Sequence, residues 1–272
     1  MVVGGYSGDG LFPQLGAAVM AETPLIQARG LYKRFGRQEV FKGLSLDIMR
    51  GEILAVVGRS GTGKSVFLKH LIGLVRPDRG QILVAGQDIH QGGSRHLAQV
   101  RERFGMLFQG GALFDSLTVE ANVAFPLQEK TRISAAEIRA AVAEILKSVG
   151  LEGVESKFPD QLSGGMRKRV ALARALILHP EIVLFDEPTT GLDPILVQSI
   201  QHLIADTQAH FHYTAVVVSH EIPKIFDIAT RVAMLHEGVI LEVDTAARFQ
   251  RSSNPAVQQF IAGRLEGPLT PT

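Results

Sequence analysis

The sequence predicts an α/β fold with a mostly parallel central sheet. Three short apolar runs, 53–57, 182–185 and 215–218, have the length and the branched aliphatic residues of strands buried on both faces. Helical patterns separate these runs, and buried strands that alternate with helices are typical of a mostly parallel sheet in an α/β core. In open sheets of this kind, ligands bind beyond the carboxyl ends of the strands.

The composition limits what kind of protein this is. With 272 residues, 46% of them hydrophobic, the chain can form one large domain or two closely packed ones. The formal net charge of +1 lacks the basic excess of proteins that bind nucleic acid or an anionic membrane surface, so we expect no nucleic-acid partner. The absence of cysteine excludes disulfides and thiolate metal sites and suits a reducing cytoplasm.

The sequence also bears on where the protein works. No apolar run approaches the roughly 18 residues that a membrane-spanning helix needs. The N-terminus lacks the basic start and the apolar stretch of a signal peptide. If the protein serves a membrane, we expect it to do so from the cytoplasmic side and through a partner.

Composition and periodicity divide the chain into segments. Residues 1–22 are rich in glycine and small residues, which predicts disorder, and Met20 just before the first patterned segment is an alternative start. We expect one domain over 23–247 and a helical tail over 248–272, with its helix around 256–262. Within the domain, 114–178 is predominantly helical, and we interpret it as a subdomain inserted between two strands of the core.

One helix of this insertion has clear end signals. Ser134-Ala-Ala-Glu137 is a capping box, in which the first and last residues bond each other's backbone amides at a helix start. The pattern predicts a helix that continues to about Val149 and is stopped by Gly150. Apolar residues on one face of that helix are Ile138, Val142, Ile145 and Leu146.

A glycine-rich segment follows the first buried run. Its residues 58–65, Gly-Arg-Ser-Gly-Thr-Gly-Lys-Ser, match the phosphate-binding P-loop pattern, in which backbone amides and a helix start cradle phosphate oxygens. Lys64 would reach the β- and γ-phosphates, and the Ser65 hydroxyl would coordinate Mg²⁺. An ordinary glycine turn before a helix is the alternative interpretation. The predicted phosphate-binding residues are Gly58, Arg59, Ser60, Gly61, Thr62, Gly63, Lys64, Ser65 and Val66.

Two acidic residues, Asp186 and Glu187, follow the second buried run. This is the place where open α/β sheets bind their ligands. Asp186 would hold Mg²⁺ through water, and Glu187 could polarise the attacking water as a general base. Acidic residues at strand ends are also common surface features, so the P-loop carries much of this interpretation.

A second small cradle is formed by Ser163-Gly164-Gly165 at a predicted helix start. Its purpose within a single chain is obscure because one P-loop already surrounds the phosphates. A serine and two glycines between a P-loop and an Asp-Glu strand end resemble the signature motif of ABC ATPases. The resemblance extends from about Leu25 to Val243, and its motifs occur in the family's order.

The resemblance implies roles for further residues. Phe35 resembles the aromatic residue that stacks on adenine, and Gln109 matches the glutamine that senses Mg²⁺ and water and links to the permease. Asp193 matches a loop that crosses the dimer interface, and His220 matches the histidine at the γ-phosphate. The resulting catalytic set is Lys64, Gln109, Glu187 and His220. The resulting magnesium set is Ser65, Gln109 and Asp186.

The family also implies an architecture and a mechanism. We expect an ABC ATPase core that combines the mostly parallel sheet with an N-terminal antiparallel β subdomain and the inserted helical subdomain. Two copies would meet head to tail, so that each ATP lies between the P-loop of one chain and residues 163–165 of the other. ATP would close this dimer, and hydrolysis would reopen it.

Two positions depart from the commonest family pattern. Ser65 stands where threonine is usual, which keeps the hydroxyl, and Met166 stands where glutamine is usual, which removes a polar side chain near the dimer interface. The basic run 167–169 just after Met166 is interpreted as a solvated helix face.

The segments around 106–115, 122–127 and 254–268 resemble the Mla-type, MCE-associated phospholipid-transport ATPases. That resemblance implies an integral membrane permease, an MCE-domain lipid-binding protein and sometimes a small cytoplasmic regulatory subunit as partners. It places the ATPase at the cytoplasmic face of a bacterial inner membrane, driving phospholipid movement between the inner and outer membranes. The alternatives are an ABC ATPase for another cargo and a non-transport ABC ATPase.

Overall fold

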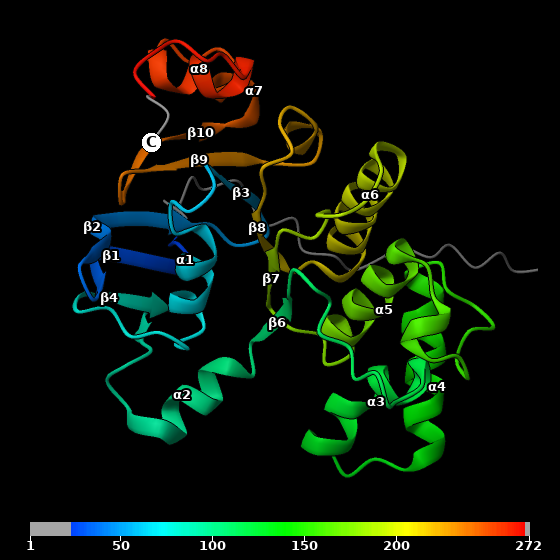
Figure 1. Cartoon of the computed structure of the whole chain (residues 1–272). Coiled ribbons are helices and arrows are strands. Elements are labelled where there is room, and N and C mark those ends of the chain that lie inside the picture. The colour runs from blue at the N-terminus through cyan, green and yellow to red at the C-terminus, as the bar shows by residue number, and fades with distance from the viewer. Residues whose placement is uncertain (1–22, 270–272) are drawn as a thin grey trace, which may run out of the picture.

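The computed structural model describes residues 23–269. The predictions made for residues 1–22, disorder and a possible start at Met20, lie outside this part of the chain. Two sheets and the helices packed around them make up the structure (Figure 1). The predicted α/β class is therefore confirmed.

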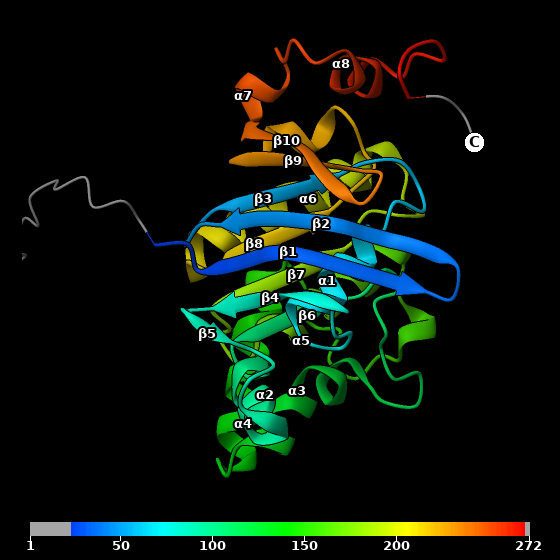
Figure 2. The ribbon, with the colours of Figure 1, turned by 90° about the vertical axis from the view of Figure 1, so that its left-hand side faces the viewer.

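Sheet A, the N-terminal sheet, has four antiparallel strands in the order β2–β1–β4–β5. Its strands are β1 (Ile26–Phe35), β2 (Gln38–Ile48), β4 (Arg79–Val84) and β5 (Gln87–Asp88). A tight turn joins β1 to β2, and Gly36 in that turn has a φ of +57°, which a residue without a Cβ adopts at little cost. Figure 2 shows the long β1–β2 hairpin lying across the molecule in front of the second sheet. This sheet is the antiparallel subdomain that the family resemblance implied.

Sheet B has six strands in the order β10–β9–β3–β8–β7–β6. They are β3 (Ile53–Val57), β6 (Phe104–Leu107), β7 (Ile182–Asp186), β8 (Thr214–Val218), β9 (Arg231–His236) and β10 (Val239–Thr245). The strands from β9 to β6 pair in parallel, and β10 pairs with β9 in the antiparallel sense. Every residue of β3, β7 and β8 is buried, as their uninterrupted apolar runs predicted.

Two hydrophobic clusters cover the opposite faces of sheet B. Leu54 and Val56 of β3 belong to the cluster that joins sheet B to sheet A and to helix α1 (Lys64–Leu71). Ile53 and Val57 of the same strand belong to the cluster on the other face. The strand that leads into the P-loop is therefore packed from both sides, which fixes the position of the loop at its end.

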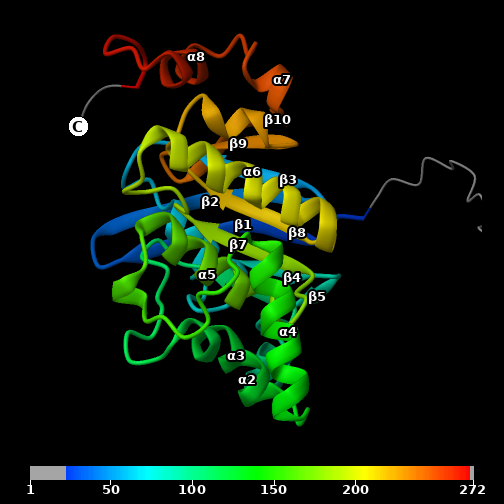
Figure 3. The same ribbon diagram turned by 90° about the vertical axis from the view of Figure 1, so that its right-hand side faces the viewer.

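Four helices lie on the face of sheet B that is turned away from sheet A (Figures 1 and 3). They are α3 (Val119–Lys130), α4 (Ala135–Ser148), α5 (Gly164–Leu176) and α6 (Pro194–Phe211). A short 3-10 turn, Pro159–Gln161, precedes α5, and helix α2 (Gly93–Arg101) leads from sheet A to β6.

The capping box at the start of α4 is present. Ser134 Oγ accepts a hydrogen bond from the Glu137 amide at 3.3 Å, and the Glu137 carboxylate accepts one from the Ser134 amide at 2.7 Å. Gly150, with a φ of +69°, follows the helix end. The sequence signals thus predicted both ends of this helix correctly.

Beyond β8, a second 3-10 turn, Lys224–Asp227, leads to β9, and two short helices follow β10. These are α7 (Ala246–Phe249) and α8 (Pro255–Ala262), which lie beside the β10 edge of sheet B (Figures 1 and 2). The tail helix expected around 256–262 corresponds to α8. Asn254 caps it, accepting from the Ala256 amide at 3.0 Å.

Candidate nucleotide-binding site

The P-loop connects the end of β3 to the start of α1, and its shape depends on two glycines. Gly58 has a φ of +150°, and a Cβ added there would lie 2.3 Å from the carbonyl oxygen of Leu235. Gly63 has a φ of +100°, and a Cβ there would lie 2.6 Å from Cγ1 of Val40. Larger residues at either position would push the loop away from sheet A or from β9.

Lys64 is folded into this loop. Its Nζ donates hydrogen bonds to the carbonyl oxygens of Gly58 at 2.9 Å and Arg59 at 2.8 Å, and the residue is 5% exposed. Burial lowers the pKa of Lys64, while the negative charges of Asp186 and Glu187 oppose that shift. A buried ammonium beside two carboxylates makes this end of the sheet strongly polar.

The end of β7 supplies the oxygen atoms that a divalent cation requires. Ser65 Oγ donates to Asp186 Oδ1 at 2.6 Å, so a hydroxyl and a carboxylate meet at one point. Magnesium prefers oxygen ligands and uses one or two carboxylates beside phosphates and water. Among residues 23–269, no group of three or more His, Asp or Glu side chains is arranged to hold a metal by itself.

Glu187, the residue after β7, is the centre of a polar cluster. Its Oε2 accepts hydrogen bonds from Gln109 Nε2 at 3.2 Å and Thr190 Oγ1 at 3.0 Å. Its Oε1 lies 3.6 Å from His220 Nδ1. Its backbone φ of +47° is uncommon for a residue with a Cβ, and such strain tends to occur at functional sites.

The sheet order explains why these distant residues meet. Gln109 follows β6, Glu187 follows β7 and His220 follows β8, and the three strands are neighbours in sheet B. Parallel strands end at the same edge, so the residues after them converge there. Thr190 was not predicted, although a hydroxyl three residues after the acid is a visible signal.

A cavity of about 310 Å³ lies at this edge. It is lined by Ser60, Gly61, Gly63, Lys64, Ser65, Val66, Gln109 and Glu187. Arg59 and Thr62 line a neighbouring hollow together with His236 and Glu237 of the β9–β10 turn. The P-loop residues, Gln109 and Glu187 are thus brought to one place, as the sequence indicated.

Other predicted residues lie outside the lining of that cavity. Ser163 caps α5 by accepting from the Met166 amide at 3.2 Å, and Gly164 and Gly165 form the first turn of that helix. Asp193 caps α6, accepting from the Ile195 amide at 2.9 Å. Phe35 stands at the tip of the β1–β2 hairpin and is 46% exposed. Within a single chain these residues therefore do not line the P-loop cavity.

The interpretation of residues 167–169 as a solvated helix face fits Arg167, which is exposed, but is wrong for Lys168. Lys168 is 7% exposed, and its Nζ donates to the backbone carbonyl oxygen of Gln109. Arg167 donates to the Leu162 carbonyl oxygen at 2.6 Å. Arg169 donates to the carbonyl oxygen of Val149 at 2.6 Å and to the Ser199 hydroxyl at 2.9 Å. Their hydrogen bonds go to backbone oxygens and one hydroxyl, a use that charge counting does not reveal, and the negative charges of Asp186 and Glu187 also act on Lys168.

Helix α5 therefore holds the loop that carries Gln109. We call residues 108–118, between β6 and α3, the Gln109 loop. Besides the Lys168 contact, Arg174 donates to the carbonyl oxygens of Gly111 at 2.9 Å and Ala112 at 2.8 Å. Burial lowers the pKa of both Lys168 and Arg174. The helix that begins at Ser163 is thus tied by two cations to the loop that reaches Glu187.

The fold and the site define a class of protein. A buried parallel strand, a glycine loop closed over a lysine, and an acid pair at the end of another parallel strand of the same sheet make a P-loop nucleotide-binding protein. Comparison with known proteins then gives the family, because the family model described as ABC transporter matches residues 41–190. The chain belongs to the ABC transporter family and is one of its ATPases.

Its relatives include transport ATPases from several bacteria. The chain is 44% identical over 262 residues to the probable ribonucleotide transport ATP-binding protein mkl of Mycobacterium leprae, covering 96% of this chain and 73% of that protein. It is 39% identical over 245 residues to the intermembrane phospholipid transport system ATP-binding protein MlaF of Escherichia coli K12, covering 90% and 91%. The chain is therefore homologous to a phospholipid-transport ATPase.

A solved structure agrees with the fold. The dimeric post-hydrolysis state of the ATP-binding cassette MJ0796, bound to ADP and Pi, is 30% identical with a TM-score of 0.74. The match covers 81% of this chain and 98% of that one. Among the residues that the structure describes, no helix is both long and apolar enough to cross a membrane.

Proposed function

We propose that this chain hydrolyses ATP as one half of a head-to-tail dimer beneath a membrane permease. The observation that carries the proposal is the cluster around Glu187, with Gln109 at 3.2 Å and His220 at 3.6 Å, next to the P-loop. Hydrolysis of a phosphate by a positioned water requires an acid–base group, a water-orienting amide and groups that stabilise the developing charge.

The P-loop binds the phosphates. Its backbone amides and the start of α1 donate hydrogen bonds to the negatively charged phosphate oxygens, and Phe35 stacks on the adenine. Lys64, which now donates to the carbonyls of Gly58 and Arg59, turns to the β- and γ-phosphates when nucleotide enters. Charged oxygens are stronger acceptors than carbonyls, so this exchange favours binding.

Magnesium fits beside the phosphates at the Ser65–Asp186 pair, which stand 2.6 Å apart. Ser65 Oγ would hold the ion directly, Asp186 through water, and Gln109 from the side of its loop. When bound, the ion neutralises charge on the β- and γ-phosphates. The remaining chemistry belongs to the protein's own side chains.

Glu187 holds the attacking water and accepts its proton. As the proton moves to the carboxylate, the water oxygen bonds to the γ-phosphorus and the bond to the β–γ bridging oxygen breaks, leaving ADP and phosphate. Hydrogen bonds from Gln109 and Thr190 fix the carboxylate, and His220 stands beside it to contact the γ-phosphate. Gln109, Glu187 and His220 reach the reaction from the ends of three different strands.

The cradle at the start of α5 requires a second chain. Ser163, Gly164 and Gly165 do not line the P-loop cavity of their own chain, yet they present a helix N-terminus that suits an anion. In a head-to-tail dimer they would close over the partner's γ-phosphate, with Asp193 at the crossing. A related cassette forms a dimer with ADP and Pi, which supports this arrangement.

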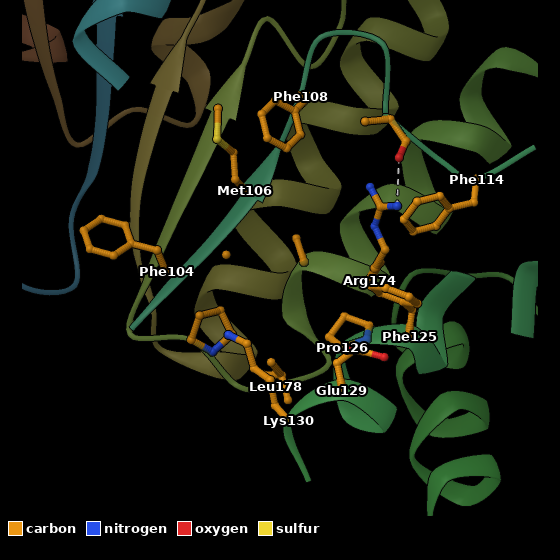
Figure 4. Close-up of a pocket in the computed structure, with 14 residues that line it drawn as sticks. Phe104, Met106, Phe108, Phe114, Phe125, Pro126, Glu129, Lys130, Arg174 and Leu178 are labelled. Atoms are coloured by element: carbon orange, nitrogen blue, oxygen red, sulfur yellow. Dashed lines mark hydrogen bonds between the residues drawn. The ribbon is translucent and has the colours of Figure 1, made fainter. Parts of the chain in front are cut away.

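An apolar groove offers a place for the permease. It has a volume of about 450 Å³ and is lined by residues of β6, the Gln109 loop, α3 and α5. Phe108, Phe114 and Phe125 are 38%, 43% and 38% exposed there, and Arg174 lies beside Phe114 (Figure 4). We propose that a short apolar helix of the permease occupies this groove, because Arg174 ties its wall directly to the Gln109 loop.

The proposed cargo is phospholipid, moved between the inner and outer bacterial membranes. Homology to MlaF over 90% of the chain supports it. The partners would be a permease, an MCE-domain lipid-binding protein and a small regulatory subunit, at the cytoplasmic face of the inner membrane. Within the chain, we assign the ATPase domain to 23–247, its helical insertion to 114–178 and the tail to 248–272.

The alternative is the same ATPase chemistry with another cargo. The relative in Mycobacterium leprae is a probable ribonucleotide transport ATP-binding protein, which makes a ribonucleotide the second candidate cargo. Neither cargo touches the ATPase in the proposed mechanism, so the site residues do not separate the two.

The test is purification of the tagged protein from detergent-solubilised native membranes, with partners and bound lipid identified by mass spectrometry. A multispanning permease, an MCE-domain protein and phospholipid are expected. Recovery of a different permease with a soluble-substrate receptor would overturn the cargo and leave the ATPase chemistry in place. A matched purification with the groove substitution Phe125→Glu is expected to lose the permease.

A further inference from the structure

The hairpin that carries Phe35 extends beyond the rest of sheet A. Strand β1 pairs with β4 only as far as Tyr32, which faces Arg79, whereas its pairing with β2 continues to Phe35 and Gln38. The last residues of β1 therefore belong to a two-stranded ribbon. Such a ribbon is marginal in water without further support, and Phe35 stands at its end.

Asp78, just before β4, supplies that support. Its amide donates to the Tyr32 carbonyl oxygen at 2.8 Å, which extends the ladder by one backbone bond. Its Oδ2 accepts from the Arg34 amide at 2.7 Å, so a side chain replaces the missing strand at the next position. Its Oδ1 accepts from Lys33 Nζ at 2.8 Å. One carboxylate thus holds two consecutive residues of β1.

Lys33 extends the connection to the ring of Phe35. Its Nζ also donates to the Arg76 carbonyl oxygen at 2.8 Å and stands 5.3 Å from the Phe35 ring centroid, over the ring. The Lys33 side chain is 14% exposed, although lysines normally extend into water. An ammonium fixed against an aromatic ring attracts its π electrons and restrains it.

The same segment is anchored to the phosphate cradle. Val40 and Phe41 of β2 pack against Gly63 at the start of α1, and the loop 76–78 follows the end of α1. The hairpin is therefore fastened near both ends of the helix whose first turn forms part of the P-loop. Two anchor points fix the distance and angle between Phe35 and that loop.

We propose that Asp78 and Lys33 are positioning residues for nucleotide binding, which hold Phe35 at the height and tilt that a purine base needs for stacking. The inference rests on the proposed stacking role of Phe35. The latch made by Asp78 and Lys33 acts on the base and sugar end of the nucleotide and leaves the phosphates to the P-loop. Its loss therefore weakens ligands that carry a base and spares those that do not.

The experiment compares two ligands on the full chain: MgATP and magnesium tripolyphosphate, which has the phosphates without the base. Asp78→Ala is expected to raise the Kd of MgATP about tenfold and to leave that of tripolyphosphate unchanged. The KM for ATP should rise with kcat unchanged at saturation. Lys33→Met should show the same pattern more weakly. Asp47→Ala, which removes the ion-pair partner of Arg29 at the other end of β1, is the matched control.

Phe35→Ala separates the inference from the proposal beneath it. Adding Asp78→Ala to Phe35→Ala should weaken the binding of MgATP no further, because the latch acts only through the Phe35 ring. Equal loss of both ligands in Asp78→Ala would make Asp78 a general support of sheet A and overturn the inference. If Phe35→Ala weakened the binding of MgATP while Asp78→Ala did not, the positioning role of Asp78 would be refuted and the stacking role of Phe35 would stand. Unchanged MgATP affinity in Phe35→Ala would refute the stacking role of Phe35 and, with it, the positioning role of Asp78 and Lys33.

Discussion

The P-loop edge of sheet B and the first turn of α5 differ in how complete they are. At the strand ends, Lys64, Ser65, Asp186 and Glu187 already meet one another within one chain. At the start of α5, Ser163 caps its own helix and the two glycines form the first turn of that helix. The first region is held together by contacts within one chain, whereas the second presents the backbone amides of a helix N-terminus.

The two regions are nevertheless connected. Lys168 and Arg174 bond three carbonyl oxygens of the Gln109 loop, and Gln109 bonds Glu187. A displacement of α5 would therefore move the side chain that donates to Glu187, the proposed general base. Binding of a partner chain and its nucleotide at the first turn of α5 would in this way change the position of Gln109.

The largest effect is expected from a substitution of Glu187, the proposed general base in the complete region. Glu187→Gln keeps the size and the hydrogen bonds of the side chain but cannot accept the water's proton, so hydrolysis should fall about 10²- to 10⁴-fold. ATP should still bind, and a stable dimer should accumulate, measured by size-exclusion chromatography with light scattering. Glu181→Gln, at the opposite end of the same strand, is the control and should hydrolyse normally. Rapid hydrolysis by Glu187→Gln would refute the base.

The next prediction tests whether the two regions act across chains. Lys64→Ala spoils the complete region and Ser163→Arg spoils the incomplete one, so each variant alone should show background hydrolysis. In an equal mixture, half of the dimers pair one of each, and each mixed dimer has one intact site. By this statistical count, about a quarter of the wild-type rate should return. Absence of any recovery after subunit exchange, confirmed by differently tagged chains, would contradict the head-to-tail arrangement.

A smaller effect is expected when the connection is cut. Lys168→Met leaves the Gln109 carbonyl without its buried donor, and such a loss costs about 1–3 kcal/mol. If that cost falls on the position of Gln109, hydrolysis should drop about tenfold while ATP affinity stays the same. Lys168→Arg should restore part of the rate, and the exposed Lys147→Met should have no effect. A fall in ATP affinity with an unchanged rate would show that Lys168 serves binding instead.

The sequence predicted the complete region well because its signals are local. The strand runs 53–57 and 182–185, the glycine loop and the Asp186–Glu187 pair each follow from neighbouring residues. Helix α4 was predicted for the same reason, from a capping box and a stop glycine. The order of strands in sheet B then brings these local features together.

What the sequence could not provide is long-range and depends on packing. The run 167–169 looked solvated because three adjacent charges usually are, yet Lys168 is buried against a carbonyl 59 residues away. Asp78 and Lys33 are 45 residues apart, and neither belongs to a motif. Carbonyl oxygens carry no sequence signature, so side chains that exist to satisfy them are invisible until the backbone is placed.

The smallest expected effect concerns the rigidity of the complete region, at the far end of α1. His70 is fully buried, its Nδ1 donates to the Val66 carbonyl oxygen at 2.7 Å, and its ring centroid lies 5.1 Å from that of Phe41. Its Nε2 has no partner among the described residues. Burial is the main cause that lowers the pKa of His70, and the hydrogen bond to Val66 is the main one that opposes it; the charges of Lys33 and His90 add to the lowering, and that of Asp78 opposes it.

The sign of the pH dependence follows from this lowered pKa. Below about pH 6.5 the unfolded histidine takes up a proton that the folded one resists, so stability is lost as the pH falls, by at most about 1.4 kcal/mol per pH unit. Thermal unfolding between pH 7.5 and 5.5 should therefore show a smaller decrease in Tm for His70→Leu than for the wild type. The exposed His202→Leu should follow the wild type. Equal slopes for all three proteins would mean that His70 accepts its proton inside the fold, and that the packing between α1 and sheet A is looser than its burial indicates.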